Sequence, residues 1–274
     1  MKKSMTILIA FFALSLTSAQ EKIVTVEEIY ANYIEAIGGS EKLDKVVNKK
    51  EIRSISNDYE ITGQSAEKGA YKEEDIGLID SEEHLVAYIT RYITNKGDTL
   101  LSRQLQANGK STTWLPNGEK KEKKIVVDKF KEGGCFPSTI IPAGSEILPN
   151  EIFNEKEVYV VHLKKRISND EWHVYTYFDM NSGFVIGEKT VGANDAMATS
   201  YLRTIEYGDY KEVEGIFIPH TRKMYEKSVS SHGISTIIKN KTTQVIAVEF
   251  NTDIKDFKNN CFKKPEECFE KAIK

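Results

Sequence analysis

Residues Trp172–Lys189 read WHVYTYFDMNSGFVIGEK, two short apolar runs joined by a polar turn. The runs Trp172–Phe178 and Phe184–Lys189 consist largely of Val, Ile, Tyr, Phe and Thr, which pack well on a pleated surface. Between them, Asp179–Gly183 supplies the Asp, Asn, Ser and Gly that tight turns favour. The stretch therefore predicts a β-hairpin.

The same pattern recurs along most of the chain after residue 50. Further strands are predicted at Tyr59–Gly63, Leu85–Ile93, Leu100–Ala107, Thr112–Leu115, Val158–Leu163, Tyr201–Tyr207, Ile216–Tyr225, Ile234–Ile238 and Thr242–Phe250. Asn108-Gly109 is a type I′ hairpin signal. Short strands at near-regular spacing predict one large antiparallel sheet or barrel. Several strands look apolar on both faces, which favours a curved sheet around an apolar interior over an open sheet with one wet face.

One helix is predicted ahead of these strands. Thr25 and Glu28 form a capping box, and Gly38-Gly39 ends the helix. Ser40 then caps a second short turn over Glu41–Val47. The apolar stripe of the first helix consists of Val26, Ile29, Tyr30, Tyr33, Ile34 and Ile37, and we expect Ile29, Tyr33 and Ile37 to act as a lid over the sheet.

The pattern breaks between Ile125 and Ile141, where Pro137 marks a loop that continues through Pro142 to Pro149. This stretch is either a second part of the lid or a surface crossover without a function, and the sequence does not separate the two. The chain holds no long linker, low-complexity segment or repeat, so residues 20–274 are expected to form a single domain.

The N-terminus has the three parts of an export signal. Met1-Lys2-Lys3 is positive, Ile7–Leu14 is apolar, and Thr17-Ser18-Ala19 is a small-residue cleavage site. The alternative is a membrane anchor, but the apolar run is short for a span. No Cys follows the run to carry a lipid anchor. Residues 1–19 are therefore predicted to be a cleaved signal peptide, and the protein is expected to be periplasmic or secreted.

The three cysteines fit an oxidising compartment. Cys261 and Cys268 are predicted to form a disulfide that pins the C-terminal tail. A metal or redox site is the alternative, but a redox pair normally has two residues between its cysteines, and no His cluster lies nearby. Cys135 stands apart and is interpreted as a partly buried spare thiol, with a nucleophile as the alternative.

Four landmarks, taken in order, carry a resemblance to a known family. They are the helix–Gly-Gly–helix start at residues 33–43, the hairpin at 176–185, the hairpin YGDYKEVEGIFIPH at 207–220, and an ending made of Glu249–Asn251 with Phe262–Pro265. Together they resemble the LolA/LolB-like family of periplasmic lipoprotein carriers. More narrowly, they resemble its outer membrane lipoprotein-sorting branch in Bacteroidetes-type bacteria. The C-terminal segment with Cys261 and Cys268 departs from the family, and none of the family's functional polar residues maps onto this chain.

The resemblance implies an unclosed antiparallel β-barrel with a helical lid over an apolar cavity that holds a lipid, an acyl chain or a lipoprotein lipid moiety. The expected lining is Leu85, Ala87, Ile89, Trp114, Tyr175, Tyr177, Tyr201, Ile205 and Tyr207. The face that each strand turns to the cavity is not fixed by the sequence. Burying acyl chains contributes about 0.8 kcal/mol per methylene, so a carrier needs no special polar motif.

Composition and motif searches exclude several classes of protein. The net charge of −3 argues against a generic nucleic-acid or anionic-membrane binder, and 40% hydrophobic residues argue against a disordered chain. No hydrolase elbow, nucleotide-binding loop or zinc-protease motif is present, so we expect no cofactor, no metal and no catalytic residue. His162 and His173 lie on adjacent predicted strands but lack a third metal ligand. Asp179–Gly183 resembles half a calcium loop, and a hairpin turn fits it better. Lys120–Lys124 is either a solvated turn or a site for anionic head groups.

These features favour an exported, monomeric carrier whose partners are lipid or lipoprotein acyl chains, with envelope proteins as possible further partners. An enzyme acting on an exported substrate is the first alternative, and ionisable groups with shifted pKa clustered in a cavity would favour it. A protein-binding accessory of the outer envelope is the second, and a filled interior with an exposed apolar patch would favour it.

Overall fold

The computed structural model describes residues 24–63, 66–93, 99–124, 135–167, 170–194, 199–230, 235–264 and 267–269. The expected signal peptide (1–19), residues 125–134 of the loop with several prolines, and Ile234 at one strand end lie outside these ranges. Within them, no helix is long and apolar enough to cross a membrane.

Two helices precede the sheet. Helix α1 (Val26–Ala36) begins at the predicted capping box, in which Thr25 Oγ1 accepts a hydrogen bond from the Glu28 amide at 3.2 Å. Helix α2 (Ser40–Leu43) follows after the glycine pair. Gly38 has a φ of +134°, and a Cβ at this position would lie 2.6 Å from the Gly215 carbonyl oxygen. The glycine therefore allows the helix end to approach the sheet closely.

A single antiparallel sheet of thirteen strands makes up most of the rest of the described chain. The strands are β1 (Asn48–Gly63), β2 (Glu67–Asp80), β3 (Leu85–Ile93), β4 (Thr99–Ala107), β5 (Lys110–Trp114), β6 (Lys120–Lys124), β7 (Ser145–Phe153), β8 (Lys156–Ile167), β9 (Asp170–Asp179), β10 (Val185–Asn194), β11 (Thr199–Val213), β12 (Ile216–Ser230) and β13 (Ser235–Phe250). Their order is β6-β5-β4-β3-β2-β1-β13-β12-β11-β10-β9-β8-β7, so β6 and β7 are the two edges. The mainly β fold with an unclosed sheet and an N-terminal helix is confirmed.

The predicted turns are present. Asn108 and Gly109 both have positive φ, as a type I′ turn requires. In the 179–183 turn, Asp179 Oδ1 accepts the Asn181 amide at 2.9 Å and Gly183 donates its amide to the Asp179 carbonyl at 2.9 Å. The interpretation as a hairpin turn is therefore confirmed.

Several stretches differ from the expectation. Strand β2 was not predicted, and residues 235–238 and 242–250, expected as two strands, lie on the single strand β13. Lys120–Lys124 is edge strand β6 rather than a turn, and all five of its residues are exposed. Lysines on an edge strand discourage pairing with another chain. The segment around Pro149 forms edge strand β7, whose pairing with β8 is irregular between Leu148 and Glu151. An irregular edge position tolerates a proline that lacks an amide donor.

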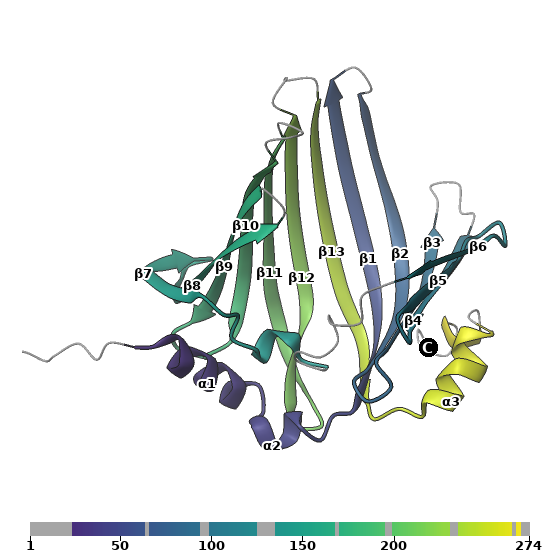
Figure 1. Cartoon of the computed structure of the whole chain (residues 1–274), viewed down its shortest axis with the longest axis horizontal. Helices are drawn as coiled ribbons and strands as arrows, with labels where there is room; N and C mark the ends of the chain where they lie inside the picture. The colour runs from purple at the N-terminus through teal and green to yellow at the C-terminus, as the bar shows by residue number, and fades with distance from the viewer. Residues whose placement is uncertain are drawn as a thin grey trace, which may run out of the picture.

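Figure 1 shows α1 and α2 at one end of the long central strands and α3 near strands β3–β6. The helices pack with two different sets of sheet residues, one with α1 and one with the C-terminal tail. Helix α1 packs on what we call the α1 face, where Ile29, Tyr33 and Ile37 are 2–6% exposed and contact sheet residues such as Phe178 and Ile218. The opposite side is called the outer face. Side chains alternate between these two faces along the strands, except at irregular positions such as those after Leu148 and Val185.

The C-terminal tail covers part of the outer face. It consists of α3 (Ile254–Asp256), the π-helical segment η3 (Phe257–Phe262) and the short stretch 267–269. Phe257 and Phe269 are 1% and 0% exposed and pack with Ile52 and Leu78 of the outer face. The tail therefore completes a second core.

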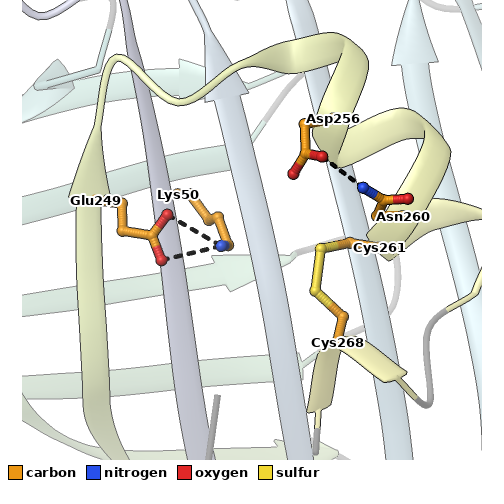
Figure 2. Close-up of a disulfide and its surroundings, with 6 residues drawn as sticks. All are labelled: Lys50, Glu249, Asp256, Asn260, Cys261 and Cys268. Carbon is orange, nitrogen blue, oxygen red and sulfur yellow. Dashed lines mark hydrogen bonds and ion pairs between the residues drawn. A yellow bond between two sulfur atoms is a disulfide. The ribbon is translucent and has the colours of Figure 1, made fainter. Parts of the chain in front are cut away.

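The predicted disulfide joins Cys261 and Cys268 within this tail (Figure 2). Beside it, Asn260 Nδ2 donates to Asp256 Oδ1, and on the adjacent strands Lys50 Nζ lies 3.0 Å from Glu249 Oε1. The predicted disulfide is confirmed, and it joins two positions within the tail.

Candidate ligand cavity

A cavity of about 480 Å³ lies between α1, the short 3₁₀ helix η2 (Pro137–Thr139) and the α1 face of the sheet. Its apolar lining consists of Ile37, Ile79, Cys135, Phe136, Val185, Phe217, Ile218 and Pro219. Its polar lining consists of Tyr33, Lys49, Glu51, Arg53, Tyr88, Ser138, Glu188, Tyr207, Tyr210 and Arg222. The cavity is therefore amphipathic rather than uniformly apolar.

The apolar wall is built where α1 and η2 meet the strands. The hydroxyl groups of Tyr33 and Ser138 are hydrogen-bonded at 2.9 Å, which ties α1 to η2. Phe136 is 9% exposed and its ring packs against Phe250 of β13, with 6.1 Å between centroids. The described part of the proline-containing loop thus packs on the α1 face, beside the cavity.

Cys135 lies at the same end of the cavity as a free, buried thiol. Burial raises the pKa of this thiol to about 11. The thiol is therefore protonated at neutral pH, which agrees with a spare thiol rather than an activated nucleophile.

Another part of the lining, which we call the charged wall, carries a group of charges centred on Glu51. Its carboxylate lies 3.1 Å from Lys49 Nζ and 3.3 Å from Arg222 Nη2, and Arg53 Nη1 is 3.9 Å away. Burial by itself would raise the pKa of Glu51, but Lys49, Arg222 and Arg53 together lower it to about 2. Glu51 is therefore a permanent anion at neutral pH.

Each of the two arginines of this group has a hydrogen-bond donor without a partner among the described residues. Arg53 Nη2 donates to Asp75 Oδ2 at 3.3 Å. The Nε atoms of Arg53 and Arg222 are buried, and neither has a hydrogen-bond partner within the described part of the chain. A buried donor without a partner costs about 1–3 kcal/mol. The parts of the two side chains that a ligand can reach are the 17% of Arg53 and the 28% of Arg222 that stay exposed at the cavity.

Two tyrosines complete the wall on β11. Tyr207 donates its hydroxyl to Glu188 Oε1 at 3.0 Å, and Tyr210 donates to the Val185 carbonyl at 2.6 Å. Burial is the main cause that raises the pKa of both phenols. Both hydroxyls therefore stay protonated and act as fixed donors.

Of the nine residues expected to line a cavity, Tyr207 lines this one, together with Tyr33 and Ile37 of the expected lid. Ile205 and Tyr201 lie two and six residues before Tyr207 on β11, so they share its face of the strand without lining this cavity. Tyr201 donates its hydroxyl to Glu226 Oε2 at 3.0 Å. Ile29 lines a separate hollow of about 330 Å³ between α1 and the 178–183 turn.

The remaining six lie on the outer face. Leu85, Ala87 and Ile89 are buried in the core beneath the tail. Trp114 meets the tail residue Phe262 with ring centroids 5.4 Å apart. Tyr177 stacks on Phe153 at 4.4 Å, and Tyr175 stacks on His162 at 4.8 Å. The tail and β7 explain why these strands are apolar on both faces.

Sequence reasoning missed the charged wall. Lys49, Glu51 and Arg53 occupy alternate positions of β1, so one face of this strand collects all three. That alternation is visible in the sequence, but the partner Arg222 is about 170 residues away and is brought near only by the pairing of β1 and β12 with β13.

The two histidines singled out from the sequence do meet on the outer face. His162 Nε2 and His173 Nδ1 are 2.9 Å apart, and Glu146 and Glu171 accept at the two ends at 2.8 and 3.0 Å. Within the described ranges no group of three or more His, Cys, Asp or Glu side chains is arranged for a metal ion. The ring nitrogens are engaged with each other and with the carboxylates.

Comparison with known proteins gives distant structural matches. No family model matches the sequence, and no curated protein matches it. A LolA superfamily protein from Nitrosomonas europaea is 11% identical, with a TM-score of 0.43 over 85% of this chain and 97% of the other. The Mycobacterium tuberculosis lipoprotein LppX is 7% identical, with a TM-score of 0.27 over 79% and 94%. Lipovitellin is 9% identical, with a TM-score of 0.31 over 74% of this chain and 26% of the other.

The expected resemblance is thus matched by structural similarity to a LolA superfamily protein and by no sequence family. The narrower lipoprotein-sorting branch stays a prediction. These likenesses are too distant to carry an argument about function, which rests on the cavity.

Proposed function

We propose that this protein is an exported carrier that binds a lipid or acyl chain in the cavity beneath α1 and performs no chemistry on it. The observation that carries the proposal is the 480 Å³ cavity, one wall of which is formed by apolar side chains of α1, the η2 segment and the sheet. A site of this volume and partly apolar lining is typical of small-molecule binding.

The volume sets the size of the ligand. A methylene takes up about 30 Å³, close to the share of a water molecule in the liquid, so 480 Å³ holds about 16 methylenes when full. One acyl chain fits this space, and three long chains exceed it. Burial of about ten methylenes contributes about 8 kcal/mol before the cost of association, which is compatible with micromolar binding.

The charged wall is the observation that favours an enzyme, because ionisable groups with a shifted pKa gather in a cavity. The direction of the shift argues against that function. A general acid or base works best with a pKa near the working pH, whereas the pKa of Glu51 is lowered to about 2 by its cationic neighbours. Glu51 is suited to holding the arginines in place rather than to transferring a proton.

The test uses the mature, delipidated protein and an environment-sensitive fluorescent fatty acid. We expect saturable uptake in the micromolar range. Ile79→Trp fills the cavity from β2 and should weaken uptake at least tenfold, whereas the same substitution at the half-exposed Ile246 should leave uptake unchanged.

Circular dichroism and melting curves of both variants separate a filled cavity from a damaged fold. Absence of uptake by the correctly folded wild-type protein would overturn the carrier function. Equal uptake by Ile79→Trp and wild type would place the ligand elsewhere.

A further inference from the structure

We infer that the ligand is a single-chain amphiphile with an anionic head, a carboxylate or a phosphate monoester, and that the head lies at Arg53 and Arg222. This inference rests on the proposed carrier function and specifies its ligand. The charged wall and the apolar wall line one cavity, so a ligand that fills it must be polar at one end and apolar at the other.

The local charge favours an anion. Lys49, Arg53 and Arg222 contribute three positive charges, and Glu51 and Asp75 contribute two negative charges within the same contact network. These side chains are 8–28% exposed, so water screens them only in part. One positive charge of the network is therefore left without a counter-ion.

Glu188 also faces the cavity and offsets that excess for the lining as a whole. It lies on β10, two strands away from Arg222 on β12, and it accepts a hydrogen bond from Tyr207. The positive excess is thus confined to the end of the cavity formed by β1 and β12, and an anionic head is directed to that end.

The hydrogen-bond inventory points to the same place. Arg53 and Arg222 each leave a buried Nε–H without a partner among the described residues. A carboxylate or phosphate offers only acceptors and forms charge-assisted bonds with guanidinium groups, and the side chains of Arg53 and Arg222 keep 17% and 28% of their surface exposed at the cavity. An alcohol provides an acceptor without charge, and a quaternary ammonium provides neither.

The acyl chain of the ligand then packs against the apolar wall of the cavity. Ile37, Phe136 and Ile218 line the same cavity, and Lys49 Nζ lies 5.4 Å from the centroid of the Phe136 ring, so the two walls meet at this pair. A ligand with its head at the arginines therefore extends directly onto apolar side chains of α1, the η2 segment and β12.

The experiment compares four ligands with the same twelve-carbon chain by calorimetry at pH 7.5: dodecanoate, dodecyl phosphate, dodecanol and dodecyltrimethylammonium. We expect the two anions to bind at least tenfold more tightly than the alcohol and the cation. The ratio of dodecanoate to dodecyl phosphate distinguishes a fatty-acid source from a phosphorylated one.

Equal affinity for all four would overturn the anionic head while leaving the carrier function standing. Binding of none of them would overturn the carrier function itself. If dodecyltrimethylammonium binds more tightly than the two anions, the charged wall favours a cationic head and the inference is wrong.

Three variants test the location of the head. Arg222→Gln should weaken dodecanoate binding about tenfold and leave dodecanol binding unchanged. Glu51→Gln removes the resident anion and should strengthen dodecanoate binding. Lys223→Gln is the matched control, because this exposed residue is the neighbour of Arg222 on the other face of β12.

A damaged fold lowers the affinity for all ligands, so the opposite signs expected for Arg222→Gln and Glu51→Gln exclude that explanation. Dodecanol binding of each variant reports that the cavity is intact. If Arg222→Gln and Lys223→Gln behave alike, the head does not lie at Arg222.

Discussion

At the scale of single residues, Glu51 holds the charged wall together. Its carboxylate contacts cations from both β1 and β12, which are not neighbours in the sheet. Removing one partner of such a buried group leaves uncompensated charge, which costs far more than the loss of a surface ion pair.

Glu51 predicts a specific pH dependence of stability. Its pKa falls from the ordinary 4.5 to about 2 on folding, so the stabilisation is complete above pH 4.5 and is lost as the pH falls through about 2. The shift corresponds to about 3 kcal/mol. Urea unfolding of wild type and Glu51→Gln should show a difference that shrinks between pH 4.5 and 2.5. A difference independent of pH in this range would contradict the assignment, and Glu212→Gln, at an exposed position of β11, is the control.

The cysteines predict a simple alkylation pattern. Cys135 is buried with its pKa raised to about 11, and Cys261 and Cys268 are joined. Intact mass after alkylation should show no adduct on the native protein, one after denaturation without reductant, and three after reduction. Three adducts without reductant would show that the disulfide is absent.

At the scale of elements, α1 depends on its buried stripe. Ile29 and Tyr33 are 2% and 6% exposed against the α1 face, and Tyr33 lies edge-on to Phe178 with centroids 5.8 Å apart. An aspartate placed there would be a buried charge without a partner.

Ile29→Asp and Tyr33→Asp should therefore each lower the free energy of unfolding by several kcal/mol, measured by chemical denaturation. Ala31→Asp, on the exposed side of the same helix, is the matched control and should change stability little. Unchanged melting of both buried-site variants would mean that α1 does not pack on the sheet.

The tail is the second element with a structural role. Phe257 is 1% exposed and packs over the outer face with Ile52, Leu78 and Leu85. Truncating a buried phenylalanine costs about 3–5 kcal/mol, so Phe257→Ala should destabilise the protein strongly. Lys258→Ala removes only the neighbouring surface pair with Glu83 and should have a small effect. Similar effects of both substitutions would show that the tail is peripheral.

At the scale of the whole molecule, the open sheet covers its two faces by different means. Helix α1 and the η2 segment cover part of one face and leave a cavity, while the tail packs on the other face and closes a core. The division predicts that ligand binding and tail packing are independent, because they use opposite faces of the same strands.

The size of the cavity predicts a limit on ligand length. Affinity for straight-chain fatty acids should rise with each methylene and level off near about 16 carbons, where the 480 Å³ are filled. Calorimetry with carboxylates of eight to twenty carbons measures the limit. A continued rise to the longest chain would show that the ligand extends beyond the described cavity.

The sequence determined the elements through local chemistry. The capping box at Thr25, the turn at Asn108-Gly109 and the alternation along the strands each depend on residues close together in the chain. The disulfide between Cys261 and Cys268 spans only seven residues and could be predicted for the same reason. These features together predicted one large antiparallel sheet or barrel with an N-terminal helix, and the resemblance to the LolA/LolB-like family implied that the sheet is unclosed.

Only the tertiary structure decided which face of each strand meets the cavity. A shift of one residue in the register of a strand moves every side chain to the other face of the sheet. Where both faces of a strand are apolar, the sequence does not show which register is correct. Leu85, Ala87 and Ile89 thus belong to the core under the tail, while Glu51 and Arg222 meet through strands far apart in the chain. The charged wall follows from long-range strand pairing, which no local pattern in the sequence specifies.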